Sequence, residues 1–150
     1  MKAVKPDADA LARACAAAMY ERDRAARAMG IAIDEARSGY ARLSMTIGET
    51  MLNGHDIAHG GVTFALADTA FAYACNSRNV PNVALQCSVS YVAPVRLGDR
   101  LTAEATEQSA SGRTGVYDVT VTRAGDDAVV AMFRGVCYRV KGTVLEGAAP

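Results

Sequence analysis

The chain begins with a helical pattern of apolar residues and then changes to the pattern of a strand. Between positions 11 and 19 apolar residues recur every three or four positions, after a helix-start signal at Pro6-Asp7 and before a stop signal at Gly30. From Tyr40 the apolar period becomes two, which places one set of side chains on a single face: Ala41, Leu43, Met45 and Ile47. The sequence therefore predicts an N-terminal helix followed by a half-buried strand.

The next pattern, over residues 61–77, is a helix that is apolar nearly all round. No helix-breaking residue appears in it before the Asn76 to Pro81 region. A helix without a polar face is expected to be buried, and this one would span about 25 Å at 1.5 Å per residue. Asp68 is the exception, a carboxylate in the middle of "FALADTAFAYA".

Four strand-like runs follow the long helix. They are 83–91, "DRLTAEATEQ", "TGVYDVTVTR" and "AVVAMFRGVCYRV", and the segments "RLGD", "SASGR" and "AGDD" between them are typical turns. The order of elements predicts an α+β fold in one domain, residues 1–150. In it, one strand precedes the long helix, a meander follows, and the antiparallel sheet curls around the helix.

Composition narrows the class of protein. Acidic and basic residues balance at 16 each, which argues against a nucleic-acid partner. No apolar run reaches about 18 residues, so no membrane span is expected, and the N-terminus has no signal-peptide pattern. The four cysteines form no C-x-x-C pair and are expected to be free thiols of a cytoplasmic protein. No P-loop, dinucleotide fingerprint or G-x-S-x-G elbow is present, so no cofactor is expected.

Two features of the segment from Asn53 to Ser77 indicate chemistry. Asp68 in an apolar helix is either a paired structural group or a functional group whose charge is costly to bury. The "HGG" sequence at the start of the helix serves as a tight turn, or offers unpaired N–H groups to an anion or developing oxyanion. Gly60 and Asp68 are eight residues apart, about 12 Å along one helix, so one carbonyl group cannot contact both. If the two act together, a second copy must supply one of them, which predicts a two-fold homodimer with sites at the interface.

Several motifs along the chain resemble those of a known family. The motifs are "NG" and "HGG" followed by "LADTAFAYACNS", with "AMYERDRAARAMGI" before them and "GRTGVYDV" and "FRG" after them. They resemble the hotdog-fold acyl-CoA thioesterases, specifically the phenylacetic-acid-degradation (PaaI) type, over residues 19–145. The resemblance implies a long helix wrapped by a curved antiparallel sheet, in dimers that pair into homotetramers. It also implies hydrolysis of phenylacetyl-CoA or hydroxyphenylacetyl-CoA.

The resemblance also implies roles for individual residues. The N–H of Gly60 would polarise the thioester carbonyl, and Gly61 would shape the turn and add its own N–H. Asp68 of the partner chain would be the nucleophile or the general base. Asn53 would orient the substrate carbonyl or the water, and His59 would hold the turn and contact the thioester.

Substrate binding requires cations for the phosphates of coenzyme A and an apolar pocket for the acyl group. The candidate cations are Arg96, Arg113, Arg134, Arg139 and Lys141, although a solvated strand position is the commoner role for any one of them. The candidate pocket residues are Phe64 and Phe71, with Met51, Leu52 and Tyr73. Related families carry a hydroxyl residue in the strand after the helix, near the carboxylate. Ala84 falls close to that place here, with Ser88 and Ser90 further on.

Four alternative interpretations fit the sequence less well. His55, Asp56 and His59 have metal-ligand chemistry, but His55 precedes the glycines that start the helix, and no metal is expected. Cys75 has no histidine at a neighbouring helical position, which favours a buried structural thiol over a nucleophile. A non-catalytic acyl-CoA-binding or regulatory domain has no use for Asp68 at the oxyanion. A dehydratase of this fold usually pairs a histidine with the acid.

Overall fold

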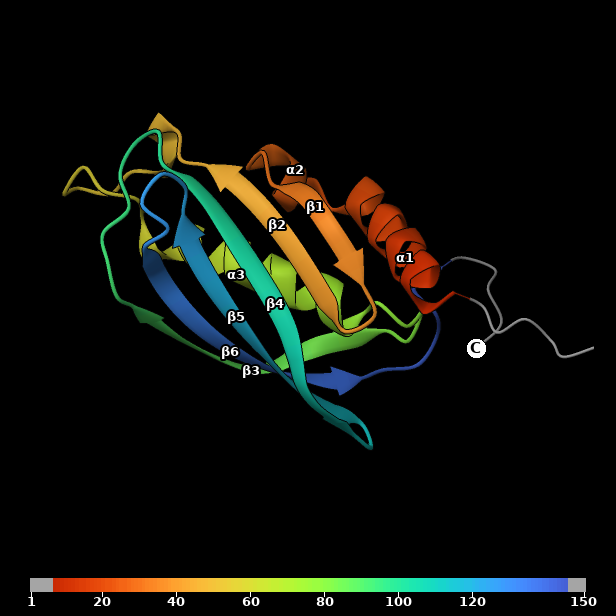
Figure 1. Ribbon diagram of the computed structural model, residues 1–150. Helices are drawn as coiled ribbons and strands as arrows, with labels where there is room; N and C mark the ends of the chain where they lie inside the picture. Colours follow the sequence, from red (N-terminus) through yellow and green to blue (C-terminus); the bar gives the residue numbers. More distant parts are fainter. Residues whose placement is uncertain (1–6, 146–150) are drawn as a thin grey trace, which may run out of the picture.

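The computed structural model describes residues 7–145. Its helices are α1 (Ala8–Arg22), α2 (Arg24–Ala28), the 3-10 turn η1 (Glu49–Met51) and α3 (Gly60–Cys75). Its strands are β1 (Ala32–Arg37), β2 (Tyr40–Thr46), β3 (Asn82–Tyr91), β4 (Arg100–Ser111), β5 (Thr114–Arg123) and β6 (Val129–Arg139). The strands form one antiparallel sheet in the order β1-β2-β4-β5-β6-β3, which wraps around α3 (Figure 1).

The N-terminal helix is interrupted where the sequence predicted one continuous helix. Asp23 ends α1 and begins α2, because its carboxylate accepts the N–H of Ala26 at 3.0 Å as an N-cap. The other carboxylate oxygen of Asp23 accepts the Tyr73 hydroxyl at 3.2 Å, which ties this break to α3. Asp7 caps the start of α1 as expected, while Pro6 lies outside the described residues.

The α+β prediction is confirmed, with two corrections to its strands. The sequence analysis missed β1, whose alternation of apolar and polar residues is weak and which pairs only with β2 at the sheet edge. The expected four-strand meander contains only β4, β5 and β6. β3 instead pairs with β6 and forms the opposite edge of the sheet. Since β3 follows α3 directly, this placement lays the strand beside the helix.

α3 packs against the inner face of the sheet and makes most of its contacts with β2, β4 and β5. Leu66, Ala67 and Ala70 are fully buried, and the small alanines allow close approach to the strands. The Phe71 ring lies over Gly135 of β6, where an added Cβ would come within 2.7 Å of the ring. Helix and sheet therefore form one continuous core. None of the helices within residues 7–145 is long and apolar enough to cross a membrane.

Candidate active site

The N-terminus of α3 presents one free backbone donor. His59 is the N-cap, and its Nδ1 accepts the N–H of Gly61 at 3.0 Å, so that in the neutral ring the proton is on Nε2. The N–H of Gly60 has no hydrogen-bond partner anywhere in residues 7–145. The carbonyl of Gly60 accepts the Tyr91 hydroxyl at 2.8 Å. Gly60 thus keeps the free donor that was predicted, whereas the Gly61 N–H is already used by the turn.

The loop before α3 brings Asn53 to the same place. Its side-chain oxygen accepts the N–H groups of His55 and Ile57 at 2.9 and 3.4 Å, which fixes the amide and leaves its NH₂ group free of protein partners in the described chain. Asn53, Gly60 and Tyr91 line a cavity of about 390 Å³ whose other walls are mostly apolar. The structure therefore brings the Gly60 backbone N–H and the Asn53 side-chain NH₂ group, from two of the predicted catalytic residues, into one pocket.

Asp68 lies outside that pocket, on the half-exposed face of α3. Its carboxylate makes no hydrogen bond or ion pair within residues 7–145, and burial raises its pKa above the usual range of an aspartate. Eight residues of helix separate it from Gly60, which is about 12 Å. A raised pKa brings a carboxylate closer to the basicity that a general base needs.

The edge strand β3 runs beside α3 in the opposite direction and is hydrogen-bonded to it near both ends. Tyr91 reaches Gly60 at one end, and Asn82 donates to the Cys75 carbonyl at 2.8 Å at the other. Between them, Cys87 lies close enough to Asp68 for the carboxylate charge to add to the desolvation that raises the thiol pKa. Sequence reasoning missed Cys87 and Tyr91. The alternation of β3 gave the signal, because it places both on the face toward the helix.

The serines of β3 considered in the sequence analysis lie on the other face of the sheet. Ser88 pairs with Arg134 and Ser90 with Met132, which are exposed positions of β6. Ala84 pairs with Cys137 on the helix side. The nearest polarisable side chain to Asp68 on this strand is therefore a thiol, in place of a hydroxyl.

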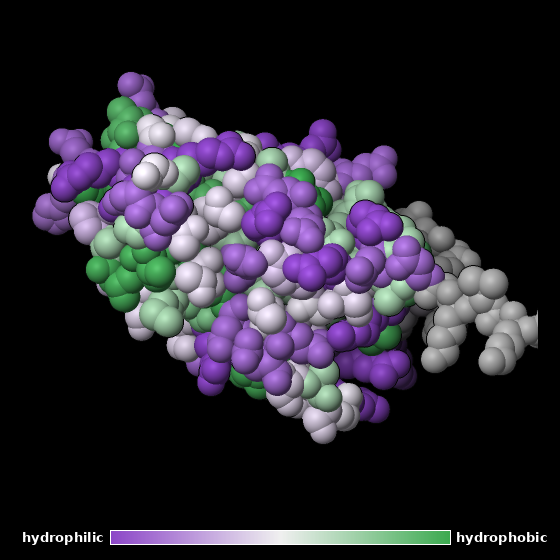
Figure 2. Space-filling model, in the orientation of Figure 1, coloured by the Kyte–Doolittle hydropathy of each residue, from purple (hydrophilic) through white to green (hydrophobic). Residues whose placement is uncertain are grey.

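An open border runs along β3 and the adjoining face of α3. β3 is an edge strand of the sheet. Apolar residues in β3 and in the connection after it are about half exposed: Val83, Leu85, Tyr91, Val92 and Leu97. Figure 2 shows apolar surface at the left of the view, over the connection that follows β3. The partly exposed positions on α3 include Ala65, Asp68, Thr69 and Ala72, which are small side chains except for the carboxylate. An exposed edge strand with apolar side chains is a template for pairing with another chain.

The five candidate cations lie in three places. Arg134 is engaged by Asp118 through two bonds of 2.6 and 2.8 Å on the outer face. Arg96 lies in the exposed turn before β4. Arg113 lines a hollow of about 560 Å³ together with Arg139 and Lys141. Only these last three form a cluster, and it lies near the C-terminal end of α3.

The two candidate phenylalanines have different surroundings. Phe64 is partly buried and meets Phe133 edge-on at 5.4 Å between ring centres. Phe71 is 1% exposed and packs against Tyr117 and Phe133 in the core. Phe71 therefore serves the core in this protomer, and Phe64 is the more exposed of the two phenylalanines. Within residues 7–145 no group of three metal-ligating side chains forms, and the imidazole of His59 is used by the turn.

Comparisons with known proteins identify the family of the chain. The family model for the thioesterase superfamily matches residues 55–130. The acyl-coenzyme A thioesterase PaaI of Escherichia coli is 46% identical over 127 residues, which are 85% of this chain and 90% of that protein. Its solved structure, described as that of the PaaI protein from the phenylacetic acid degradation operon, superimposes with a TM-score of 0.89 at 44% identity, covering 91% of this chain and 99% of that one. A Streptococcus mutans protein solved with acetyl-CoA bound has a TM-score of 0.71 at 26% identity, covering 73% of this chain and 88% of that one. The chain therefore belongs to the thioesterase superfamily and, within its hotdog-fold acyl-CoA thioesterases, to the PaaI type.

Proposed function

We propose that the protein hydrolyses arylacetyl-CoA thioesters, phenylacetyl-CoA or its ring-hydroxylated forms, in a homodimer with two sites at the interface. Each site combines Gly60 and Asn53 of one protomer with the partner's Asp68. One observation carries this proposal: α3 presents a free N–H at Gly60 and an unpaired carboxylate at Asp68, about 12 Å apart along one helix. Each group lacks the second half of a hydrolytic site, and a two-fold axis beside α3 supplies it.

The chemistry assigned to these groups is acyl transfer to water. The Gly60 N–H, at the positive end of α3, binds the thioester carbonyl oxygen and stabilises the negative charge that develops on it. The amide NH₂ of Asn53, held by the loop, donates to the same oxygen or to the attacking water. Asp68 removes a proton from that water, or attacks the carbonyl itself to give an anhydride that water then cleaves. Either route ends with the free acid and the thiol of coenzyme A.

The open border supports the dimer. Pairing of β3 with the β3 of a second copy satisfies the edge backbone groups and covers Val83 and Leu85. The small residues of α3 beside Asp68 leave room for a second helix to lie antiparallel to it. Further pairing of dimers into a homotetramer is part of the proposal and is supported by Met132, 56% exposed on β6. Light scattering measures the mass in solution.

Substrate binding is assigned to the two hollows of the protomer. The cavity at Gly60, with mostly apolar walls and Phe64 nearby on α3, takes the acyl group or the pantetheine arm. The cluster of Arg113, Arg139 and Lys141 takes phosphates of coenzyme A, since its cations are gathered at one surface. The proposed preference for aryl-acetyl groups is based on a relative. The Escherichia coli protein is described as coming from the phenylacetic acid degradation operon.

The first test compares wild type with Asp68→Asn on phenylacetyl-CoA and its hydroxylated forms. Thioester absorbance is followed directly, because the four cysteines interfere with thiol reagents. Loss of a general base is expected to reduce kcat by about 10²- to 10⁴-fold with the fold retained. Equal rates in the two proteins would refute the role of Asp68. Turnover of short aliphatic acyl-CoA but not of aryl-acetyl thioesters would refute the substrate class alone.

The second test removes the Gly60 donor without removing the turn. Gly60→Pro deletes the N–H at the first helical position, where proline is well tolerated. Gly60→Ala is its control, because it adds the same Cβ, 3.1 Å from the Tyr91 ring, but keeps the N–H. The proline variant is expected to be about 10²- to 10³-fold slower than the alanine variant.

Mixing the two defects tests whether a site spans two chains. Asp68→Asn and Gly60→Pro subunits, co-expressed in equal amounts, form heterodimers in which one of the two sites is intact. Random pairing then restores about a quarter of the wild-type activity from two inactive parents. A site contained within one chain would give no restoration, which would refute the shared interface while leaving hydrolysis itself unaffected.

A further inference from the structure

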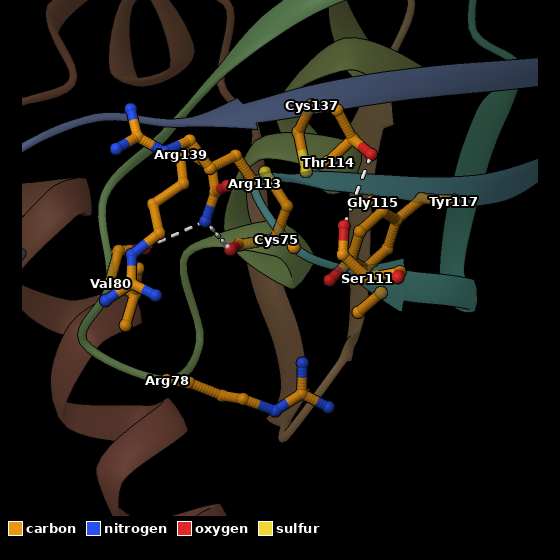
Figure 3. A pocket seen from close by; sticks show the side chains of 13 residues that line it. Cys75, Arg78, Val80, Ser111, Arg113, Thr114, Gly115, Tyr117, Cys137 and Arg139 are labelled. Atoms are coloured by element: carbon orange, nitrogen blue, oxygen red, sulfur yellow. Dashed lines mark hydrogen bonds between the residues drawn. The ribbon is translucent and has the colours of Figure 1, made fainter.

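A second hollow, separate from Gly60, contains two cysteine thiols. Cys75 ends α3 and Cys137 lies on β6, and both side chains line a cavity of about 210 Å³ (Figure 3). Cys137 pairs in register with Gly115 of β5, and its sulfur lies where a side chain on Gly115 would come within 3.0 Å. The glycine thus makes the room that the Cys137 sulfur occupies. Both thiols are free and line the same cavity, and each one shifts the pKa of the other.

The two thiols differ in acidity because of their surroundings. The interaction with Cys75, with help from backbone N–H groups, lowers the pKa of Cys137 to about 7. The same interaction, together with burial, raises the pKa of Cys75 strongly. Burial also raises the pKa values of Cys15 and Cys87. Cys137 is therefore the one of the four cysteines whose pKa is lowered, which favours its thiolate form.

The groups around the pair come from every neighbouring element. They are Asp68 on α3, Arg78 after α3, Glu107 on β4, Arg113 at the β4–β5 turn, Tyr117 on β5 and Arg139 at the end of β6. Arg78 pairs with Glu107, which also accepts the Tyr117 hydroxyl at 2.7 Å. Arg113 and Arg139 flank the opening (Figure 3). The charge of Glu107 is thus balanced by Arg78, and the rim of the cavity is cationic.

We propose that Cys137 and Cys75 form a peroxide-reactive dithiol site, in which Cys137 is the nucleophile and Cys75 the resolving thiol, giving an intramolecular disulfide between α3 and β6. The oxidant is a small hydroperoxide. Cys137 and Cys75 are only 3% and 7% exposed, which favours reaction with a small reagent over exchange with a bulky disulfide.

The reaction balances in two steps. The Cys137 thiolate attacks one peroxide oxygen, the S–O bond forms, the O–O bond breaks, and the leaving hydroxide takes a proton to become water. Cys75 then loses its proton and attacks the sulfenic sulfur, the S–S bond forms, and the S–O bond breaks to release a second water. Two electrons pass from the two sulfurs to the peroxide. Conversion of the Cys137 thiolate to a neutral sulfenic acid removes the largest cause of the raised Cys75 pKa, which prepares Cys75 for the second step.

The expected selectivity follows from the acidity. The pKa of Cys137 is lowered, whereas the pKa values of Cys87 and Cys15 are raised above the ordinary value of 9.0. A larger fraction of Cys137 is therefore ionised at neutral pH, and Cys137 is expected to react with peroxide faster than Cys87 or Cys15.

The test treats the reduced full-length protein with hydrogen peroxide at neutral pH and follows it by intact mass and peptide mapping. Wild type is expected to lose two hydrogens per chain and to yield one linked pair of peptides, Cys75 with Cys137, that dithiothreitol separates again. Cys75→Ser is expected to stop at a Cys137 sulfenic acid, which dimedone traps. Cys87→Ser and Cys15→Ser are matched controls and are expected to form the link at the wild-type rate.

Three results would overturn the proposal. The first is dimedone labelling of the Cys75→Ser variant that is spread evenly over its remaining cysteines. The second is a wild-type protein in which Cys137 passes to sulfinic acid with no link to Cys75. The third is a disulfide between chains on a non-reducing gel. Circular dichroism of each variant shows that the fold is retained, so a change in reactivity reports on the thiols.

Discussion

The contact between Phe71 and Gly135 gives a sharp prediction about how α3 is held on the sheet. A Cβ at Gly135 would lie 2.7–2.8 Å from three atoms of the Phe71 ring, against 3.4–4 Å for ordinary contact. The ring cannot withdraw, because Tyr117 and Phe133 pack on it at 5.8 Å between ring centres. Overpacking of this kind costs about 1–3 kcal/mol. At about 2–4 °C per kcal/mol for a chain of this size, Gly135→Ala is expected to lower Tm by about 2–12 °C.

A double-mutant cycle shows whether the clash is the cause. Phe71→Leu alone costs on the order of 1–2 kcal/mol by loss of packing. In the double variant the smaller side chain leaves room for the new methyl group. Its loss of unfolding free energy is therefore expected to be smaller than the sum of the two single losses, by about 1 kcal/mol or more. Urea titrations at one fixed protein concentration measure all four proteins, which removes the effect of association. Strict additivity, or an unchanged Tm in Gly135→Ala, would refute the assignment of Phe71 to the core.

Four further predictions concern charge and hydrogen bonding. Burial raises the pKa of Asp68 in the folded state, so the ionised carboxylate destabilises the fold once pH rises above the unfolded-state pKa of 3.8. The Tm of Asp68→Asn is therefore expected to be higher than that of wild type at pH 7 and equal to it at pH 3. In wild type the acid limb of kcat/KM is expected to inflect above 3.8 for the same reason, and an inflection at or below that value would contradict it. Arg78 lowers the pKa of Glu107, so Glu107→Gln is expected to lose about 1 kcal/mol at pH 7 in urea titrations, a loss that fades as pH falls below 4.5. Tyr91→Phe removes the hydroxyl that donates to the Gly60 carbonyl, and we expect it to lose about 0.5–1.5 kcal/mol of stability and to have a lower kcat. If stability and kcat are both unchanged, Tyr91 does not position Gly60.

Local patterns predicted the elements that have strong periodicity. The apolar run over 61–77 became α3, and the two-residue alternation from Tyr40 became β2. The break at Asp23 was missed because residues on both sides favour helix, and only the cap contacts with Ala26 and Tyr73 show why the chain turns. β1 was missed because an edge strand with one neighbour needs little apolar alternation.

The placement of β3 was harder to predict, because it depends on contacts far apart in the sequence. A strand that follows a helix and precedes three others fits equally well in the middle of a meander or at its edge. Pairing with β6 decides the matter, and it joins residues 40 or more positions apart in the sequence, as in Cys87 opposite Gly135. The same long-range choice brings Cys87 to Asp68 and Tyr91 to Gly60. These two neighbours of the site could not be identified before the sheet order was known.

The separation of Gly60 and Asp68 was predictable because it needs only the rise of a helix. The structure adds that both groups remain unsatisfied within the protomer, although the His59 and Asn53 side chains around the turn are already engaged. A protein that merely tolerated a carboxylate in an apolar helix would be expected to pair it, since an unpaired half-buried charge destabilises the fold. An unpaired donor at one point of α3 and an unpaired acid at another, both beside an open sheet edge, are therefore most simply explained together. Each is half of a site that forms when a second copy pairs along β3.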